Sequence, residues 1–185
     1  MEHEQIEAQL DIPNRITDPS AYRALLSGFL TFYEPMEHAL SKLDWDGAGI
    51  DFKSRRKTQL LAADLQACEV NTADLRRCRT LPPVTTPAQG LGCLYVMEGA
   101  TIGGQVVHRM LRKHLGPWID DRSRFFQCYG TEKGNRWREF REALDAFGAV
   151  HDEALQQETI DSARTTFRCL RQWLDQHTNH PPSEL

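Results

Sequence analysis

The chain has 185 residues, of which 40% are hydrophobic and 26% charged, and its net charge at pH 7 is −4. This composition excludes a disordered chain, and the acidic balance argues against a nucleic-acid-binding protein. The sequence has no apolar run of roughly 18 residues and no secretory signal, so we expect one cytoplasmic domain, residues 1–185, without a membrane span. Five cysteines without a Cys-x-x-Cys pair indicate reduced thiols.

Apolar residues repeat at helical spacing along most of the chain, which predicts an all-α fold. We expect a short first helix at about 2–10. Asp18-Pro19 predicts the start of a second helix, because an N-cap residue is followed by proline in the first turn. This helix is expected to reach about residue 43, with a kink at Pro35. Further helices are expected at about 53–68, 71–79, 134–147 and 149–177.

The strongest helix signal begins at Thr86-Pro87 and ends at Gly116-Pro117. A single helix of this length would span about 45 Å. Within it, residues 90–104 read GLGCLYVMEGATIGG and contain five glycines. Each glycine inside a helix costs about 1 kcal/mol relative to alanine, so this segment meets some demand other than helix stability.

Two explanations fit the glycine-rich segment. Glycines allow two helices to approach closely, because no Cβ separates the backbones. Alternatively, Gly99, Gly103 and Gly104 line one side of a bend, where the backbone contacts a flat ligand. Gly99 and Gly103 share a helix face because they are four residues apart, and Gly104 adjoins that face. The residues alone leave both explanations open.

A flat macrocycle such as haem would need an axial ligand from elsewhere in the chain. Among the seven histidines, His3 is followed one helical turn later by Glu7. The stretch LGCLYVMEGATIGGQVV resembles the distal helix of haem oxygenases, and His3-x-x-x-Glu7 resembles the proximal histidine motif of that family. The segments RRKTQLLAADL, FFQCYG with WREFREAL, and TIDSARTTFRCL are also similar. The resemblance covers nearly the whole chain and is strongest to the bacterial, phytochrome-associated branch.

The resemblance implies a single-domain helical bundle of about seven or eight helices with a kinked, glycine-rich distal helix. It implies oxidative opening of haem to biliverdin, carbon monoxide and free iron, with O2 and electrons from a separate ferredoxin or reductase. His3 would be the proximal iron ligand. Gly99, Gly103 and Gly104 would crowd the face of the haem where oxygen binds. Ala100 stands where well-studied members carry an aspartate that orders water; backbone carbonyls or Thr101 would hold that water here.

Other residues acquire roles only through the resemblance. Arg138 and Arg141 match the region where the family places cationic partners of the haem propionates. Glu7 accompanies the iron ligand, and Phe167 matches an apolar position near the haem. The implied partners are haem, the electron donor and, downstream, a bilin-binding photoreceptor. We expect a monomer, with a flexible tail at about 178–185.

Alternative functions remain open from the sequence. The same fold would suit a non-catalytic protein that binds haem or a partner without turnover, or a scaffold in a helical assembly. A di-iron carboxylate oxidase would need Glu-x-x-His pairs, and the sequence contains none. Hydrolysis of a thiamine pyrimidine would need a reactive cysteine, whereas Cys93 has the apolar neighbours of a structural thiol.

Overall fold

The computed structural model describes residues 16–179, and every regular element in this range is helical. The α-helices are α3 (Pro19–Leu40), α4 (Thr58–Ala67), α5 (Pro87–Ile102), α6 (Gly104–Leu115), α7 (Lys133–Val150) and α8 (Glu153–Asn179). Short 3₁₀ turns connect them: η1 (Asp46–Ala48), η2 (Lys53–Arg55), η3 (Thr72–Asp74), η4 (Gly116–Ile119) and η5 (Gly130–Glu132). The predicted all-α fold is confirmed. The helix predicted at 2–10 lies outside the described residues, as does most of the predicted tail.

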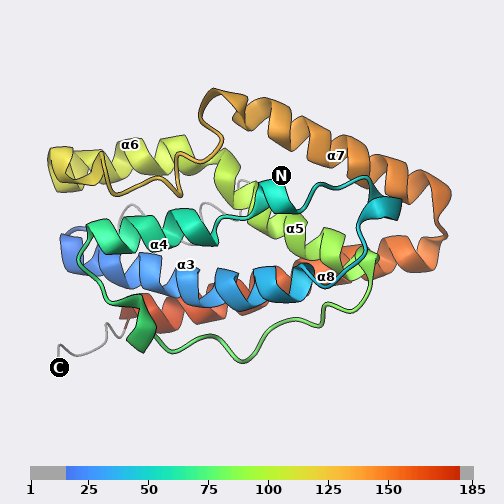
Figure 1. Ribbon diagram of the computed structural model, residues 1–185, viewed down its shortest axis with the longest axis horizontal. Helices are drawn as coiled ribbons and strands as arrows, with labels where there is room; N and C mark the ends of the chain where they lie inside the picture. The colour runs from blue at the N-terminus through green and yellow to red at the C-terminus, as the bar shows by residue number, and fades with distance from the viewer. Residues whose placement is uncertain (1–15, 180–185) are drawn as a thin grey trace.

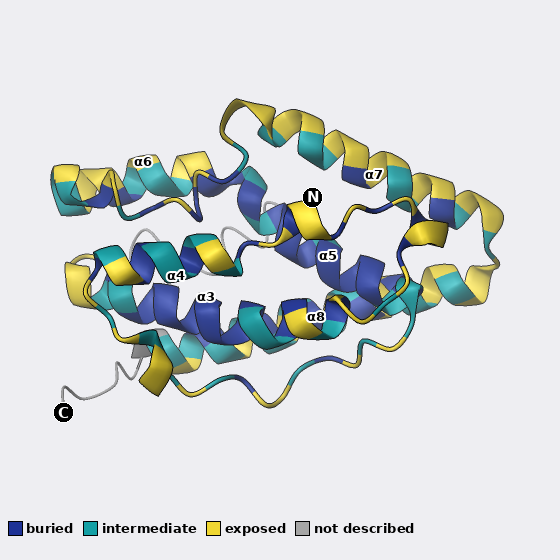
Figure 2. Ribbon diagram, viewed as in Figure 1, coloured by how far each residue is buried: buried dark blue, intermediate teal, exposed yellow. Residues whose placement is uncertain are grey.

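Helices α3, α5 and α8 form the centre of the bundle (Figure 1). The most extensive helix–helix contact joins α5 and α8, and α3 packs against both α8 and α4. Helix α7 runs over α5, while α6 extends away from the centre. Figure 2 shows that α3 and α5 are buried along most of their length, whereas α6 and α7 each expose a face. The glycine-rich helix is therefore the buried axis of the bundle.

Both proline-marked helix starts are confirmed. The Asp18 carboxylate accepts a hydrogen bond from the backbone N–H of Ala21 at 2.9 Å, and Pro19 is the first residue of α3. The Thr86 hydroxyl accepts from the N–H of Gln89 at 3.2 Å at the start of α5. Each cap satisfies an N–H group that the first helical turn leaves without a partner.

Helix α3 continues through Pro35 and ends at Leu40, three residues before the predicted end. Proline has no N–H, so the carbonyl of Thr31 loses its partner within the helix. The backbone N–H of Cys78 donates to this carbonyl at 2.9 Å. The connection after α4 is thereby fixed to the middle of α3.

Two predicted helices differ from the structure. The predicted helix at 71–79 contains only the turn η3, because the Arg77 guanidinium donates to the carbonyls of Thr72 and Leu75 and so replaces helical hydrogen bonds. The helix predicted from residue 53 begins instead at Thr58. Its start is set by the buried Glu37 carboxylate of α3, which accepts from the N–H groups of Lys57 at 2.6 Å and Thr58 at 3.1 Å.

The contact between α5 and α8 depends on a glycine. A Cβ atom on Gly92 would lie 2.3 Å from the carbonyl oxygen of Thr159 and 2.7 Å from the Cβ of Ser162. Beside it, the buried Cys93 thiol is 3.1 Å from the Thr166 hydroxyl, as expected for a structural thiol. The close-packing explanation is therefore correct for this part of the glycine-rich segment.

We expect Gly92→Ala to lower the free energy of unfolding by about 3 kcal/mol, because α8 backbone atoms must move to admit the methyl group. Urea denaturation followed by circular dichroism measures the change. Gly148→Ala is the matched control, since Gly148 lies in α7 with open space around its Cβ position. That substitution should raise stability by up to about 1 kcal/mol. Equal stabilities for the two variants would contradict the close-packing role of Gly92.

Candidate functional site

The predicted long helix is interrupted at Gly103, where α5 ends and α6 begins. The carbonyl of Gly103 accepts from the N–H groups of Val106 at 2.8 Å and Val107 at 3.0 Å, so α6 starts directly at the break. The predicted bend in the glycine-rich segment is confirmed, but it divides the segment into two helices instead of curving one. The break changes the direction of the chain within a single residue.

Gly104, the first residue of α6, has a packing role. A Cβ atom there would lie 2.0 Å from the carbonyl oxygen of Phe126. That carbonyl belongs to the loop that leads to α7. The loop is held in turn by the buried Asp64 carboxylate of α4, which accepts from the N–H groups of Arg124 and Phe125, each at 2.9 Å. The absence of a side chain at Gly104 thus allows close contact with protein, which is one of the two explanations that the sequence left open.

Gly99, in the last turn of α5, and Gly103, at the break, are both buried, and they share a helix face because they are four residues apart. Ala100 between them is half-buried. The Thr101 hydroxyl is buried and donates to the carbonyl of Glu98 at 2.7 Å. Thr101 is therefore engaged within its own helix, although its oxygen retains the capacity to accept a hydrogen bond.

A buried carboxylate, Glu98, stands immediately before Gly99 and is only 1% exposed. Its Oε2 atom accepts from Nη1 of Arg55 at 2.9 Å. Its Oε1 atom accepts from the ammonium of Lys57 and from the Tyr129 hydroxyl, the latter at 3.0 Å. Arg55 and Lys57 are themselves buried. Three segments distant in the chain thus meet at the residue that immediately precedes Gly99.

The electrostatics of this cluster favour a neutral Tyr129. Burial, followed by the Glu98 charge, holds the pKa of Tyr129 well above its usual range. The phenol therefore keeps its proton and donates it in the hydrogen bond to Glu98. Burial also raises the pKa of the neighbouring Cys128 thiol to about 11, so this cysteine is not a reactive thiolate.

The break between α5 and α6 is stabilised by a side chain from another helix, α7. In a continuous helix the carbonyl of Ile102 would accept from Val106, but the N–H of Val106 bonds to Gly103 instead. The ammonium of Lys133, the first residue of α7, donates to the Ile102 carbonyl at 2.8 Å. A cation thereby compensates the hydrogen bond that the break removes.

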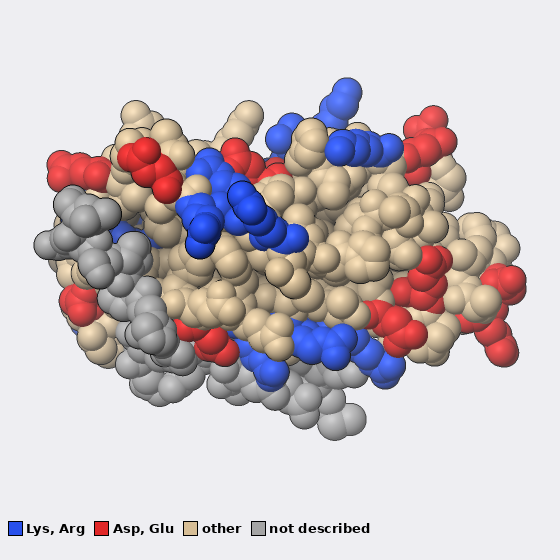
Figure 3. All heavy atoms as spheres, turned by 90° about the horizontal axis from the view of Figure 1, so that it is seen from below, with Lys and Arg blue, Asp and Glu red and all other residues tan. Residues whose placement is uncertain are grey.

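The other residues predicted from the resemblance lie elsewhere on the described surface. Arg138 and Arg141 are exposed on α7, and Arg138 donates to the side chain of Asn135 at 2.9 Å. Phe167 is half-buried on α8, where it lines a shallow hollow together with Arg164 and Arg168. Figure 3 shows that Lys and Arg side chains gather in groups on the face of the molecule seen from below. The structure brings none of these three predicted residues into contact with the glycine break.

His3 and Glu7 lie outside the described residues. Within residues 16–179 no three His, Cys, Asp or Glu side chains are grouped so that they could hold a metal ion. In the same range, none of the helices is long and apolar enough to span a membrane.

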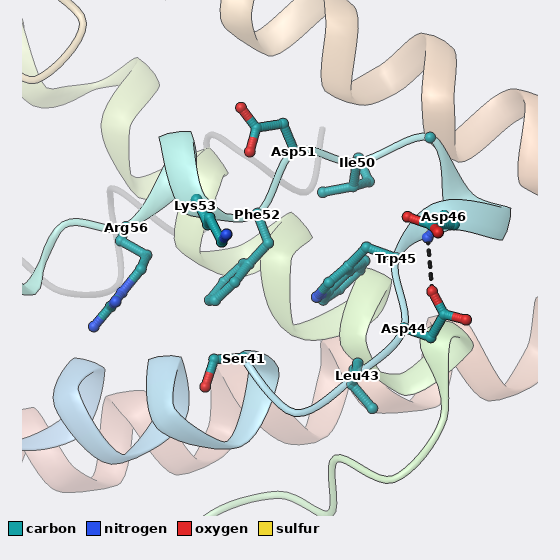
Figure 4. Close-up of a pocket in the computed structure, with 11 residues that line it drawn as sticks. Ser41, Leu43, Asp44, Trp45, Asp46, Ile50, Asp51, Phe52, Lys53 and Arg56 are labelled. Atoms are coloured by element: carbon teal, nitrogen blue, oxygen red, sulfur yellow. Dashed lines mark hydrogen bonds between the residues drawn. The ribbon is translucent and has the colours of Figure 1, made fainter.

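A separate hollow of about 660 Å³ lies between the end of α3 and η2 (Figure 4). The rings of Trp45 and Phe52 stack at its base, with centroids 5.7 Å apart. Both acidic and basic side chains surround it, among them Asp44, Lys53 and Arg56. None of the residues predicted from the sequence lines this hollow.

Comparison with known proteins shows the family to which the chain belongs. A family model described as "Heme oxygenase" matches residues 2–176 of the chain. The chain belongs to the haem oxygenase family. The match includes His3, Glu7 and the whole glycine-rich segment.

Two individual proteins support this assignment to the haem oxygenases. A "Heme oxygenase" of Xanthomonas campestris pv. campestris (strain 8004) is 29% identical over 150 residues, covering 79% of each chain. A crystal structure of the NO- and CO-bound haem oxygenase from Neisseria meningitidis shares the fold, with a TM-score of 0.69 at 16% identity. That alignment covers 98% of this chain and 94% of the other.

The Glu98 cluster is the part of this haem oxygenase that sequence reasoning missed. A single glutamate inside the apolar run YVMEG was a signal, because a charge in a buried helix needs partners. The sequence did not indicate that those partners are Arg55, Lys57 and Tyr129, since they come from two different loops.

Glu98→Ala should lower the free energy of unfolding by about 3–5 kcal/mol, because Arg55 and Lys57 would stay buried without a counter-charge. Urea denaturation at pH 7 measures the loss. The control is Glu142→Ala, which removes a carboxylate that is 70% exposed and should change stability by less than about 0.5 kcal/mol. A Glu98→Ala protein as stable as the Glu142→Ala protein would show that the buried cluster does not stabilise the fold.

Proposed function

We propose that this protein opens haem oxidatively to biliverdin, carbon monoxide and iron, using O2 and electrons from a separate ferredoxin or reductase. The observation that carries the proposal is the break at Gly103, in a chain that matches the haem oxygenase family over residues 2–176. At this break the buried backbone of Gly99 and Gly103 has no side chain to separate it from a flat substrate. Haem supplies the redox chemistry, and the protein holds and orients it.

The glycines near the break have two different roles. Gly99 and Gly103 provide the backbone surface that faces the haem and leaves room for O2 on that side. Gly104 contributes by letting α6 pack against Phe126, which fixes the angle at which the chain leaves the break. Ala100 carries no acid, so water held by backbone carbonyls near the break supplies the protons that ring opening consumes.

The remaining residues bind the substrate from its other sides. His3 would ligate the haem iron, and Glu7 would accompany it; both residues lie outside the described range. Arg138 and Arg141 are exposed on α7, which packs against α5 through the rings of Trp137 and Tyr95, 5.7 Å apart. Their guanidinium groups bind the haem propionates. Phe167 contributes an apolar surface on α8.

The cellular setting follows from the same proposal. We place the protein in the cytoplasm, as a monomer of the phytochrome-associated branch, so that its biliverdin passes to a bilin-binding photoreceptor. Because Ala100 replaces an acid, a second candidate function is haem binding without turnover. The two functions give different spectra, since only turnover removes the haem.

Hemin added to the purified protein should produce a Soret band that decays, with ascorbate or a ferredoxin system in air, into the broad red absorption of biliverdin. A stable Soret band under these conditions would support the haem-binding alternative. No spectral change at micromolar hemin would contradict both functions.

His3→Ala should abolish the Soret shift, because the iron loses its protein ligand. His38→Ala is the matched control, since His38 is exposed on α3, and it should leave the spectrum unchanged. An unaltered spectrum in His3→Ala would assign the iron ligand to another residue. Hemin titration followed at the Soret maximum measures both variants.

Gly103→Val should reduce biliverdin formation by about a hundredfold, because a branched side chain would occupy the space of the substrate. Gly148→Val, on α7 with open space around it, controls for the general effect of valine in a helix. Wild-type turnover by Gly103→Val would refute the role of the break in holding haem.

A further inference from the structure

A short segment between the Phe126 loop and α7 contacts the last turn of α5 at two points. The proposed function assigns no role to this segment. It consists of Tyr129, the turn η5 and Lys133, and we call it the 129–133 splint. Tyr129 donates to the Glu98 side chain at 3.0 Å, and Lys133 donates to the Ile102 carbonyl at 2.8 Å. Glu98 and Ile102 are four residues apart, so the two contacts bracket one turn of helix.

That bracketed turn contains Gly99, Ala100 and Thr101, and it ends at the break. Gly99 and the helical hydrogen bond that Ile102 lacks at the break both weaken this turn. The splint supplies, from outside the helix, two hydrogen bonds that the sequence of the turn cannot supply itself. One of them involves a charged donor and the other a charged acceptor, which makes each stronger than a neutral pair.

The backbone of the splint is strained in a way that serves these contacts. Tyr129 has a φ of +66°, a left-handed conformation that is uncommon for a residue other than glycine. Such a conformation persists only where the surroundings require it. Here the Tyr129 ring contacts two cations, with Nζ of Lys57 5.3 Å and Cζ of Arg136 5.4 Å from its centroid. The ring is thus fixed with its hydroxyl on Glu98.

We propose that Tyr129 and Lys133 are positioning residues that hold the last turn of α5 at a fixed height over the substrate, and thereby select which meso carbon of the haem is attacked. This inference rests on the proposed function, because it concerns the same glycine face. Neither side chain needs to touch the haem; both act through the backbone of residues 98–103.

The first test needs no haem. Hydrogen–deuterium exchange of a peptide covering residues 98–107 is compared among wild type, Lys133→Met and Tyr129→Phe. Exchange should accelerate about tenfold in Lys133→Met, as expected from the loss of a charge-assisted hydrogen bond, and by a smaller factor in Tyr129→Phe. Lys133→Arg should exchange at the wild-type rate, because a guanidinium can also donate to the Ile102 carbonyl.

Two variants control for general destabilisation. Lys42→Met removes an exposed lysine just beyond α3. Tyr22→Phe removes a buried hydroxyl that donates to the Arg122 carbonyl at 2.6 Å, away from the splint. Neither should change the exchange of residues 98–107. Exchange rates in Lys133→Met and Tyr129→Phe equal to those of the controls would overturn the proposal.

The second test uses the ratio of biliverdin isomers as a measure of how the substrate is positioned. Separation of biliverdin isomers by chromatography should show that the ratio of the main to the minor isomers falls about fivefold or more in Lys133→Met, and recovers in Lys133→Arg. Faster exchange with an unchanged isomer ratio would overturn the positioning role. Absence of biliverdin from the wild type would contradict the proposed function instead, and the exchange rates would still decide whether the splint exists.

Discussion

A carboxylate buried at the end of α5 is the constraint on which the site depends. Glu98 cannot lie in the interior of the bundle without cations, because the desolvation of an unpaired charge is costly. Arg55 and Lys57 meet this requirement, and Tyr129 adds a hydrogen bond from a third segment. The requirement brings the connection before α4 and the loop before α7 to the same point of α5. The residue that follows this point is Gly99, so the ionic cluster and the glycine face are adjacent along one helix.

The glycines of α5 and α6 allow close helix packing and also produce a helix break within one segment. Gly92 brings α5 into backbone contact with α8, and Gly104 does the same for α6 and the Phe126 loop. Between them, Gly103 interrupts the helix where both neighbours are held firmly. A break between two fixed helices keeps a defined angle, whereas a break between loosely held helices would act as a hinge. Close packing at the two ends of the segment therefore fixes the angle of the break in its middle.

The sequence predicted the features that depend on local chemistry. The caps at Asp18 and Thr86, the end of α6 at Gly116 and the bend among the glycines each follow from residues a few positions apart. Features set by distant partners were missed or misplaced. The start of α4 depends on Glu37 of another helix, and the segment at 71–79 is kept out of a helix by the Arg77 side chain. The sequence allowed a packing role for Gly104, but no local pattern reveals its partner, the Phe126 carbonyl 22 residues later in the chain.

Pro35 connects the middle of α3 to two other parts of the chain. By removing one N–H from α3, it leaves the Thr31 carbonyl to be satisfied by the backbone N–H of Cys78, in the connection after α4. The Thr31 hydroxyl in turn accepts from the indole N–H of Trp173 on α8 at 3.0 Å. Both contacts join residues far apart in the sequence, so each closes a long loop at a cost in chain entropy. One position in the middle of the first described helix therefore couples the connection after α4 to the C-terminal helix.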